Sequence, residues 1–200
     1  MKLSKATERD RELFSKPLVL GASISVGYGT KDGGIAAVLA RQINPDAQVI
    51  NMAKSGATSV QSTGHLNLEI FNPSIVLGFD LFFWDAARRQ VNKQFESNTR
   101  RIFKTFQDKK VPMIIGKIPI LDLPLGPRMD SIKKSGAEVN ALLEELCVED
   151  KKCLLYDPVD CFLSMDSGDY FSDNLHLTSA GNRYCANYFV ETIDLEKLRA

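Results

Sequence analysis

Short apolar runs alternate with amphipathic segments along the whole 200-residue chain. Continuous apolar runs between turn residues are typical of strands that are covered on both faces. Such runs predict five strands, over residues 17–20, 47–52, 73–78, 111–118 and 154–157. Apolar residues at helical spacing predict helices over residues 33–43, 86–109 and 178–193. A further helix is predicted to follow a Pro- and Leu-rich loop (119–127) and to end at about residue 149.

The alternation of strands with helices predicts an α/β fold, with a parallel sheet and helices on both of its faces. No linker, repeat or low-complexity segment divides the chain. We therefore expect a single domain over residues 17–200, preceded by an N-terminal extension over residues 1–16.

Charge and hydropathy exclude several kinds of partner. Lys plus Arg equals Asp plus Glu at 25 each, so no basic surplus favours nucleic acid. No run approaches the roughly 18–20 apolar residues of a membrane span, and the charged first twelve residues contain no apolar signal core. The default expectation is a cytoplasmic protein, although an exported protein whose signal has been removed would look the same, and the oligomeric state stays open.

The four cysteines, Cys147, Cys153, Cys161 and Cys185, show no CxxC pattern and no metal-ligand grouping. Their apolar neighbours favour small buried thiols. A Cys147–Cys153 disulfide is the alternative for an exported protein.

A candidate nucleophile follows the first strand. Residues 17–20 lead directly into Gly21-Ala22-Ser23 and then into a helix-like segment. A strand, a turn of small residues and a helix together raise one side chain above the edge of a parallel sheet. Because a serine hydroxyl is a poor nucleophile at neutral pH, Ser23 needs a base.

The chain contains two histidines, and one of them suits this role. His65 has no carboxylate near it in the sequence, whereas Asp173 precedes His176 by three residues. An acid placed in this way can orient the ring and hold its tautomer. We therefore predict a Ser23–His176–Asp173 catalytic triad; a turn serine and a helix-capping Asp–His pair are the alternative.

Four segments together resemble the SGNH (GDSL-type) hydrolase family. Residues 21–27 (GASISVG) are similar to its first block, and Asp173-x-x-His176 to its last. Residues 51–56 (NMAKSG) and 75–80 (IVLGFD) resemble the second and third blocks, in the order that the family has.

The resemblance implies a three-layer, flavodoxin-like sandwich with strand order 2-1-3-4-5. It also implies ester hydrolysis through an acyl-enzyme, as in an esterase, lipase or deacetylase, on a small-molecule or glycan/lipid ester. The N–H groups of Ser23 and Gly56 would donate to the oxyanion, and no metal or organic cofactor is needed. Ser23, Gly56 and Asp80 each follow a predicted strand, so they are expected to meet at one edge of the sheet.

Two residues depart from the family pattern. Ala22 stands where the first block has Asp, and Asp80 stands where the third block has its oxyanion-hole Asn. Asp80 could point away from the hole, could donate a hydrogen bond in its protonated form, or could leave a site that binds without turnover. The preferred hypothesis is a slow hydrolase with Asp80 in or beside the hole. An acyltransferase and an impaired ligand-binding protein are the alternatives.

Two apolar segments beyond the third and fourth strands are candidates for the substrate pocket. Their candidate substrate-binding residues are Phe82, Trp84, Ile120 and Leu123. The alternative is that these side chains only pack beneath a loop.

Overall fold

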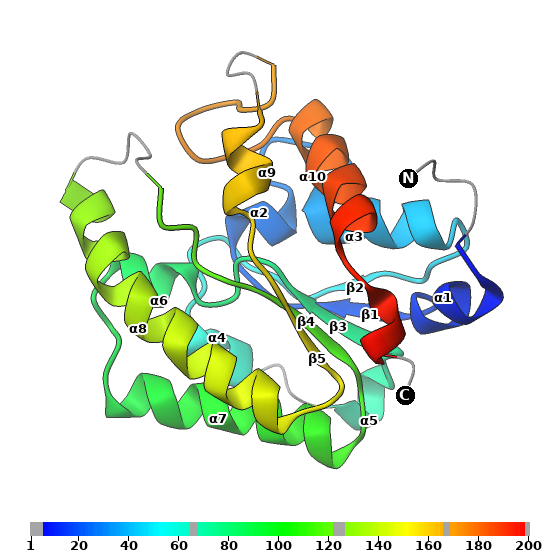
Figure 1. Ribbon diagram of the computed structural model, residues 1–200, viewed down its shortest axis with the longest axis horizontal. Coiled ribbons are helices and arrows are strands. Elements are labelled where there is room, and N and C mark those ends of the chain that lie inside the picture. The colour runs from blue at the N-terminus through cyan, green and yellow to red at the C-terminus, as the bar shows by residue number, and fades with distance from the viewer. Residues whose placement is uncertain (1–5, 65–67, 122–126, 166–168, 199–200) are drawn as a thin grey trace.

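The computed structural model describes residues 6–64, 68–121, 127–165 and 169–198 (Figure 1). Within them, five strands form one parallel sheet in the order β2-β1-β3-β4-β5, which confirms the predicted topology. The strands are β1 (Pro17–Val19), β2 (Ile50–Asn51), β3 (Ile75–Gly78), β4 (Met113–Gly116) and β5 (Cys153–Tyr156).

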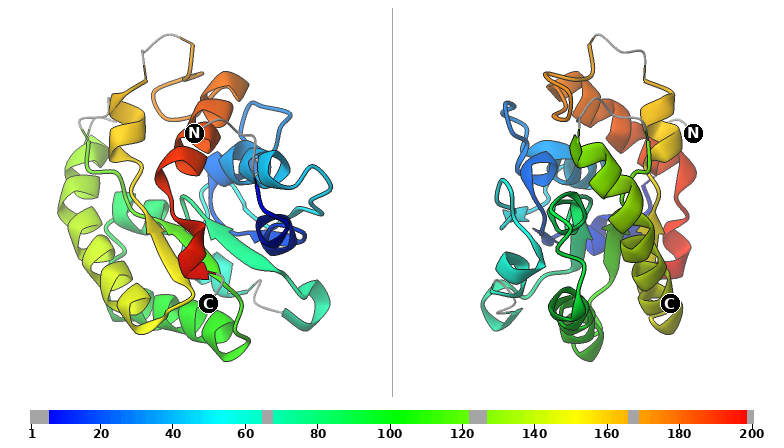
Figure 2. Two further views of the ribbon diagram at one scale, coloured as in Figure 1. Left: turned by 45° about the vertical axis from the view of Figure 1, so that its right-hand side comes forward. Right: turned by 90° about the vertical axis from the view of Figure 1, so that its left-hand side faces the viewer.

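Helices cover both faces of the sheet, as Figures 1 and 2 show. One layer holds α4 (Ser59–Thr63), α5 (Leu68–Phe71), α6 (Phe83–Ala87), α7 (Lys93–Asp108) and α8 (Pro127–Glu149). The other layer holds α1 (Glu8–Leu13), α2 (Ser23–Val26), α3 (Gly34–Ile43), α9 (Val159–Leu163), α10 (Ser179–Thr192) and the 3-10 helix η1 (Leu195–Leu198).

The two layers follow from the alternation of side chains along each strand. Leu18 and Val76 belong to the core under α6, α7 and α8. Their neighbours Val19 and Leu77 belong to the core under α3 and α10. Because both faces of each central strand are buried, the strands are continuously apolar in the sequence.

The single helix predicted over residues 86–109 is in fact two helices, α6 and α7. Arg89 adopts a left-handed backbone conformation (φ 55°), which ends the first of them. The Asn92 side chain then accepts hydrogen bonds from the N–H groups of Gln94 and Phe95 and caps α7. The apolar spacing continues across the break, which is why periodicity alone did not reveal it.

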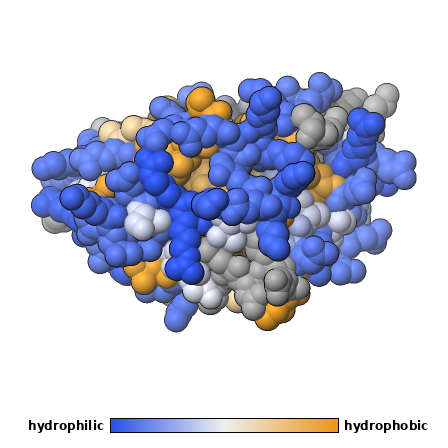
Figure 3. Space-filling model, turned by 90° about the horizontal axis from the view of Figure 1, so that it is seen from below, coloured by the Kyte–Doolittle hydropathy of each residue, from blue (hydrophilic) through white to orange (hydrophobic). Residues whose placement is uncertain are grey.

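Helix α7 buries one stripe of large side chains and exposes the rest. Phe95, Ile102, Phe103 and Phe106 lie in the core, where each contributes about 1.5–3 kcal/mol of burial free energy. Seen from the α7 side, the surface is largely hydrophilic, with small separate hydrophobic patches (Figure 3). The stripe is therefore a core face and not a ligand site.

Part of the N-terminal segment packs onto the domain. The Thr7 side chain caps α1 in a capping box with Asp10. Phe14, which follows α1, is fully buried in the core beneath α3. Residues 8–14 are thus integrated with the fold that begins at residue 17.

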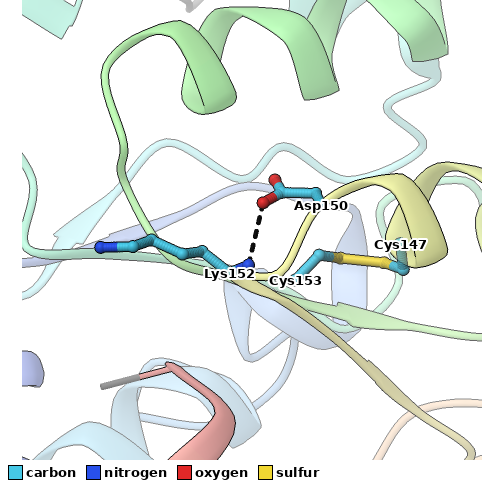
Figure 4. Close-up of a disulfide and its surroundings, with 4 residues drawn as sticks. All are labelled: Cys147, Asp150, Lys152 and Cys153. Carbon is cyan, nitrogen blue, oxygen red and sulfur yellow. Dashed lines mark hydrogen bonds between the residues drawn. A yellow bond between two sulfur atoms is a disulfide. The ribbon is translucent and has the colours of Figure 1, made fainter. Parts of the chain in front are cut away.

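The cysteines divide into two pairs. A disulfide joins Cys147, near the end of α8, to Cys153, at the start of β5, across the turn in which Asp150 accepts the Lys152 N–H (Figure 4). Cys161 and Cys185 are buried thiols whose sulfur atoms lie 3.6 Å apart. The favoured expectation of buried thiols holds for Cys161 and Cys185. The alternative, a disulfide, holds for Cys147 and Cys153.

None of the helices in the described parts of the chain has both the length and the apolar character needed to cross a bilayer.

Candidate active site

Ser23 lies at the carboxyl-end edge of the sheet, where β1 turns into α2. It is the first residue of that helix and is 4% exposed. The turn requires glycine at position 21, where φ is 150° and a Cβ atom would lie 2.3 Å from Oδ1 of Asp80. The backbone of the turn thus closes directly over a buried carboxylate.

That carboxylate, from Asp80, binds the turn at several points. Oδ1 accepts the Ala22 N–H at 2.9 Å and the Ser25 hydroxyl, and Oδ2 accepts the Ile24 N–H at 2.8 Å. Burial raises the pKa of Asp80 above its usual value, and the hydrogen bonds from these three residues oppose that rise. Both oxygens are thus engaged as acceptors beneath the turn that carries Ser23.

A glycine in β4 allows the backbone before Asp80 to take its path. A Cβ atom on Gly116 would lie 2.1 Å from the carbonyl oxygen of Phe79. The chain leaving β3 therefore passes directly against β4, and this close approach places Asp80 under Ser23.

His176 and Asp173 form the pair that their spacing predicted. The ring Nδ1 lies 2.7 Å from Asp173 Oδ2, while the N–H groups of Leu175 and His176 donate to Oδ1 at 2.8 and 2.7 Å. Partial burial raises the pKa of Asp173, but the bonds from the His176 ring and backbone outweigh it and lower that pKa to about 2. Asp173 is thus ionised at neutral pH and fixes one ring nitrogen of His176.

Tyr28 connects the serine and histidine segments, a role that the sequence did not indicate. Its ring centroid lies 4.5 Å from that of His176, and its N–H donates to the Ser23 carbonyl at 3.0 Å. No hydrogen bond joins Ser23 Oγ to the His176 ring among the residues that the structure describes. Apo sites often show loose catalytic contacts that tighten only with substrate.

A second link ties the two segments through Asp32. Its Oδ1 accepts hydrogen bonds from the Thr30 hydroxyl at 2.7 Å, the Gly34 N–H at 3.1 Å and the Asn182 amide at 2.9 Å. Burial raises the pKa of Asp32, and these bonds outweigh it and lower that pKa. An ionised Asp32 thus holds α10, which follows His176, against the segment that follows Ser23.

Gly56 comes from the second block, which lies beside the turn that carries Ser23. The nearby Lys54 N–H donates to the Gly21 carbonyl at 3.1 Å, and the Asn51 side chain donates to the Ser25 carbonyl at 2.9 Å. Within the described ranges, the N–H groups of Ser23 and Gly56 have no hydrogen-bond acceptor. Two backbone donors are thus available at this edge.

Asp85 is a buried carboxylate that sequence reasoning missed. It accepts the N–H of Ser59 at 2.9 Å and the Ser59 hydroxyl at 2.8 Å, and so fixes the start of α4 against α6. Burial raises its pKa to about 6, against the bonds from Ser59. The signal in the sequence was an acid at the end of the apolar run 81–84.

Asp85 should make stability depend on pH. Its pKa is higher in the folded state than in the unfolded chain, so its contribution to stability is full below about pH 4 and is lost as the pH rises through about 6. The shift of about two units corresponds to roughly 3 kcal/mol in the free energy of unfolding. Urea unfolding of wild type and Asp85→Asn at pH 4 to 7 measures this loss. Equal slopes in the two proteins would contradict the assignment.

A small apolar cavity of about 30 Å³ adjoins the segments that carry Ser23 and His176. Ile24, which follows Ser23, and Leu175, which precedes His176, both line it. The rest of its apolar lining includes Phe83, Ile118, Phe162 and Phe171.

Of the four predicted substrate-binding residues, the three that the structure describes do not line this cavity. Phe82 is fully buried, and its ring packs edge to face on Phe95. Trp84 lies under the Arg88 guanidinium, Ile120 is 42% exposed, and Leu123 lies outside the described residues. The two predicted segments do reach the cavity, but through neighbours of these residues, because the side chains on a helix or loop point in different directions.

The fold resembles several solved structures at low sequence identity. A psychrotrophic esterase EstA from Pseudoalteromonas sp. is 20% identical, with a TM-score of 0.66, over 89% of this chain and 96% of that one. TesA is 21% identical, with a TM-score of 0.68, over 91% and 98% of the two chains. A family 3 carbohydrate esterase from Clostridium thermocellum is 18% identical, with a TM-score of 0.68, over 92% and 96%.

A search of curated proteins found no match. Residues 19–184, however, match the GDSL-like lipase/acylhydrolase family along most of the chain. The matched range contains all four segments of the site. The chain therefore belongs to the GDSL-like lipase/acylhydrolase family and is a hydrolase that acts on esters.

Proposed function

We propose that the protein hydrolyses carboxylic esters through an acyl-enzyme formed on Ser23. The observation that carries this proposal is the 2.7 Å contact between His176 Nδ1 and an ionised Asp173, beside the turn that presents Ser23. In the first step Ser23 Oγ attacks the acyl carbon and His176 accepts its proton. His176 then protonates the leaving alcohol and later activates the water that releases the acid.

Asp80 supports this reaction indirectly in the proposal. Because its oxygens already accept hydrogen bonds, it has no donor to offer to an oxyanion. It holds the backbone of residues 22–25 instead, so that the N–H of Ser23 points toward the developing charge together with that of Gly56. The replacement of Asn by Asp is then compatible with turnover, which weighs against the ligand-binding alternative.

The test of the function is hydrolysis of p-nitrophenyl acetate by the purified protein. A fluorophosphonate probe added in equimolar amount should abolish the activity and attach to Ser23, as mass spectrometry of peptides would show. Product analysis with and without an added alcohol distinguishes hydrolysis from acyl transfer. A protein that binds the ester without releasing p-nitrophenol would refute the proposal.

The cavity beside Ile24 supports a preference for short acyl groups. Its volume of about 30 Å³ suits an acetyl or propionyl group better than a long chain. Phe162→Ala should enlarge the cavity. Each further methylene that it then accommodates should lower the activation free energy by about 1 kcal/mol.

This preference can be measured with p-nitrophenyl esters of two to eight carbons. Wild type is expected to lose kcat/KM beyond four carbons, and Phe162→Ala should move the optimum to longer chains. Leu163→Ala, which changes an exposed neighbour on α9, is the control and should leave the profile unchanged. A flat wild-type profile would rule out this cavity as the acyl site.

A further inference from the structure

The proposed oxyanion hole contains a gap. Its backbone donors are the N–H groups of Ser23 and Gly56, and the Asn that the family pattern places at position 80 is an Asp bound beneath the turn. A hole with two donors forgoes roughly 10²- to 10³-fold in rate relative to one with a third donor. The surroundings of Gly56 therefore decide whether another side chain takes this place.

One cation lies next to Gly56. An Nη2 atom of Arg88 is 3.2 Å from the point that a Cβ atom on Gly56 would occupy. Arg88 follows the last residue of α6, and this helix starts at the carboxyl-end edge of the sheet that also carries Ser23. The guanidinium therefore lies next to Gly56, whose N–H forms part of the proposed hole.

The Trp84 ring restrains the position of the Arg88 guanidinium, and this contact leaves the guanidinium N–H donors unused. Its guanidinium carbon lies 5.1 Å from the centre of the Trp84 ring, a cation–π geometry that holds the planar group in place. The side chain is exposed, and it makes no hydrogen bond or ion pair within the described part of the chain. Its five N–H donors remain available to a ligand.

The charges around Arg88 do not neutralise it by direct contact. Asp85 attracts it through space, but both Asp85 oxygens accept hydrogen bonds from Ser59. The neighbouring Arg89 is directed elsewhere, since its Nε donates to the Ser131 hydroxyl at 2.9 Å. Arg88 thus presents a permanent positive charge beside the proposed hole.

We propose that Arg88 is the third donor of the oxyanion hole and replaces the amide that Asp80 cannot supply. This inference rests on the proposed ester hydrolysis. When Ser23 attacks the acyl carbon, the carbonyl oxygen becomes an oxyanion, and the guanidinium stabilises this charge together with the two backbone N–H groups. The guanidinium acts only through its charge and its N–H donors, and no proton moves to or from Arg88.

A role in the transition state predicts a specific kinetic signature. An interaction made only with the oxyanion changes kcat and kcat/KM by the same factor and leaves KM unchanged. For neutral p-nitrophenyl acetate, Arg88→Gln should lower kcat about 10- to 100-fold, less than a fully buried donor would, because water screens an exposed charge. Arg88→Lys should retain an intermediate rate, since it keeps the charge without the planar donors.

The experiment compares wild type, Arg88→Gln, Arg88→Lys and the control Arg89→Gln, each with thermal unfolding measured alongside. The fluorophosphonate should also label Arg88→Gln more slowly, by a factor similar to the loss in kcat, because phosphonylation passes through a similar developing charge. Arg89→Gln should match wild type in both assays. Slow labelling supports the proposal independently of turnover.

Three results would overturn it. An unchanged kcat for Arg88→Gln would show that the hole does not use the guanidinium. A change confined to the KM of esters that carry a carboxylate or phosphate would assign Arg88 to recognition of an anionic substrate instead. Absence of hydrolysis and of labelling in wild type would refute the proposed function itself, whereas an active wild type with an unaffected Arg88→Gln would refute only this inference.

Discussion

Replacing Ser23 by alanine is expected to reduce kcat for p-nitrophenyl acetate at least 10³-fold, and His176→Ala should do the same. In the proposed mechanism, each change removes one part of the unit that forms and breaks the acyl-enzyme. The double variant should be little slower than either single variant, because a triad fails as a whole once one member is lost. Initial rates at saturating ester, corrected for spontaneous hydrolysis, measure all three.

Ser55→Ala is a matched control for this series. Ser55 is an exposed serine that directly precedes Gly56, so its removal tests whether a change near the hole is enough to stop turnover. It should keep near wild-type activity and should still be labelled by the fluorophosphonate. Labelling at Ser25 or Ser55 in wild type would reject Ser23 as the nucleophile, and additive losses in the double variant would show that Ser23 and His176 act separately.

Asp80→Asn is expected to lower activity, although it restores the residue type of the family pattern. The carboxylate accepts N–H groups through both of its oxygens, whereas an asparagine offers one oxygen and an amide that donates. One buried N–H of the turn then faces another donor, at a cost of about 1–3 kcal/mol. We expect kcat to fall at least tenfold and the urea midpoint of unfolding to fall as well.

The comparison with Asp85→Asn separates positioning from stability. Asp85 is also buried, but it binds Ser59 and not the nucleophile turn. Below about pH 6, where Asp85 contributes to stability, its variant should lose stability. Its loss of kcat at 25 °C should be much smaller than that of Asp80→Asn, under conditions where both variants are folded. A rise in kcat for Asp80→Asn would mean that the new amide reaches the oxyanion, and Asp80 would then belong to the hole.

The sequence predicted the sheet well because its strands are buried on both faces. Each central strand is a continuous apolar run, so strand order and the active edge followed from the pattern together with the family resemblance. The break at Arg89–Asn92 was not predicted, since a left-handed residue and a side-chain cap leave the apolar spacing unchanged. Short helices such as α4 and α9 were missed because five residues are too few to show a period.

At the candidate site, the sequence predicted local contacts and did not predict long-range ones. The Asp173–His176 pairing is local, three residues apart, so spacing alone predicted it. The carboxylate of Asp80 binds residues almost sixty positions away, and its direction depends on packing that no local pattern records. The same reason explains why Tyr28 and Arg88 were not identified: each is near the site through one long-range contact.

The close approach of β4 to the segment after β3 has a consequence for how this sequence can diverge. Any side chain at position 116 would clash with the carbonyl group of Phe79, which directly precedes Asp80. The clash would displace the Asp80 carboxylate that binds the turn at Ser23. Position 116 does not line the cavity beside Ile24, yet the close approach restricts it to glycine. Substitutions at position 116 are therefore not tolerated as long as Asp80 binds the backbone of residues 22–25. Related chains that lack this glycine should hold the turn that carries their serine through other contacts.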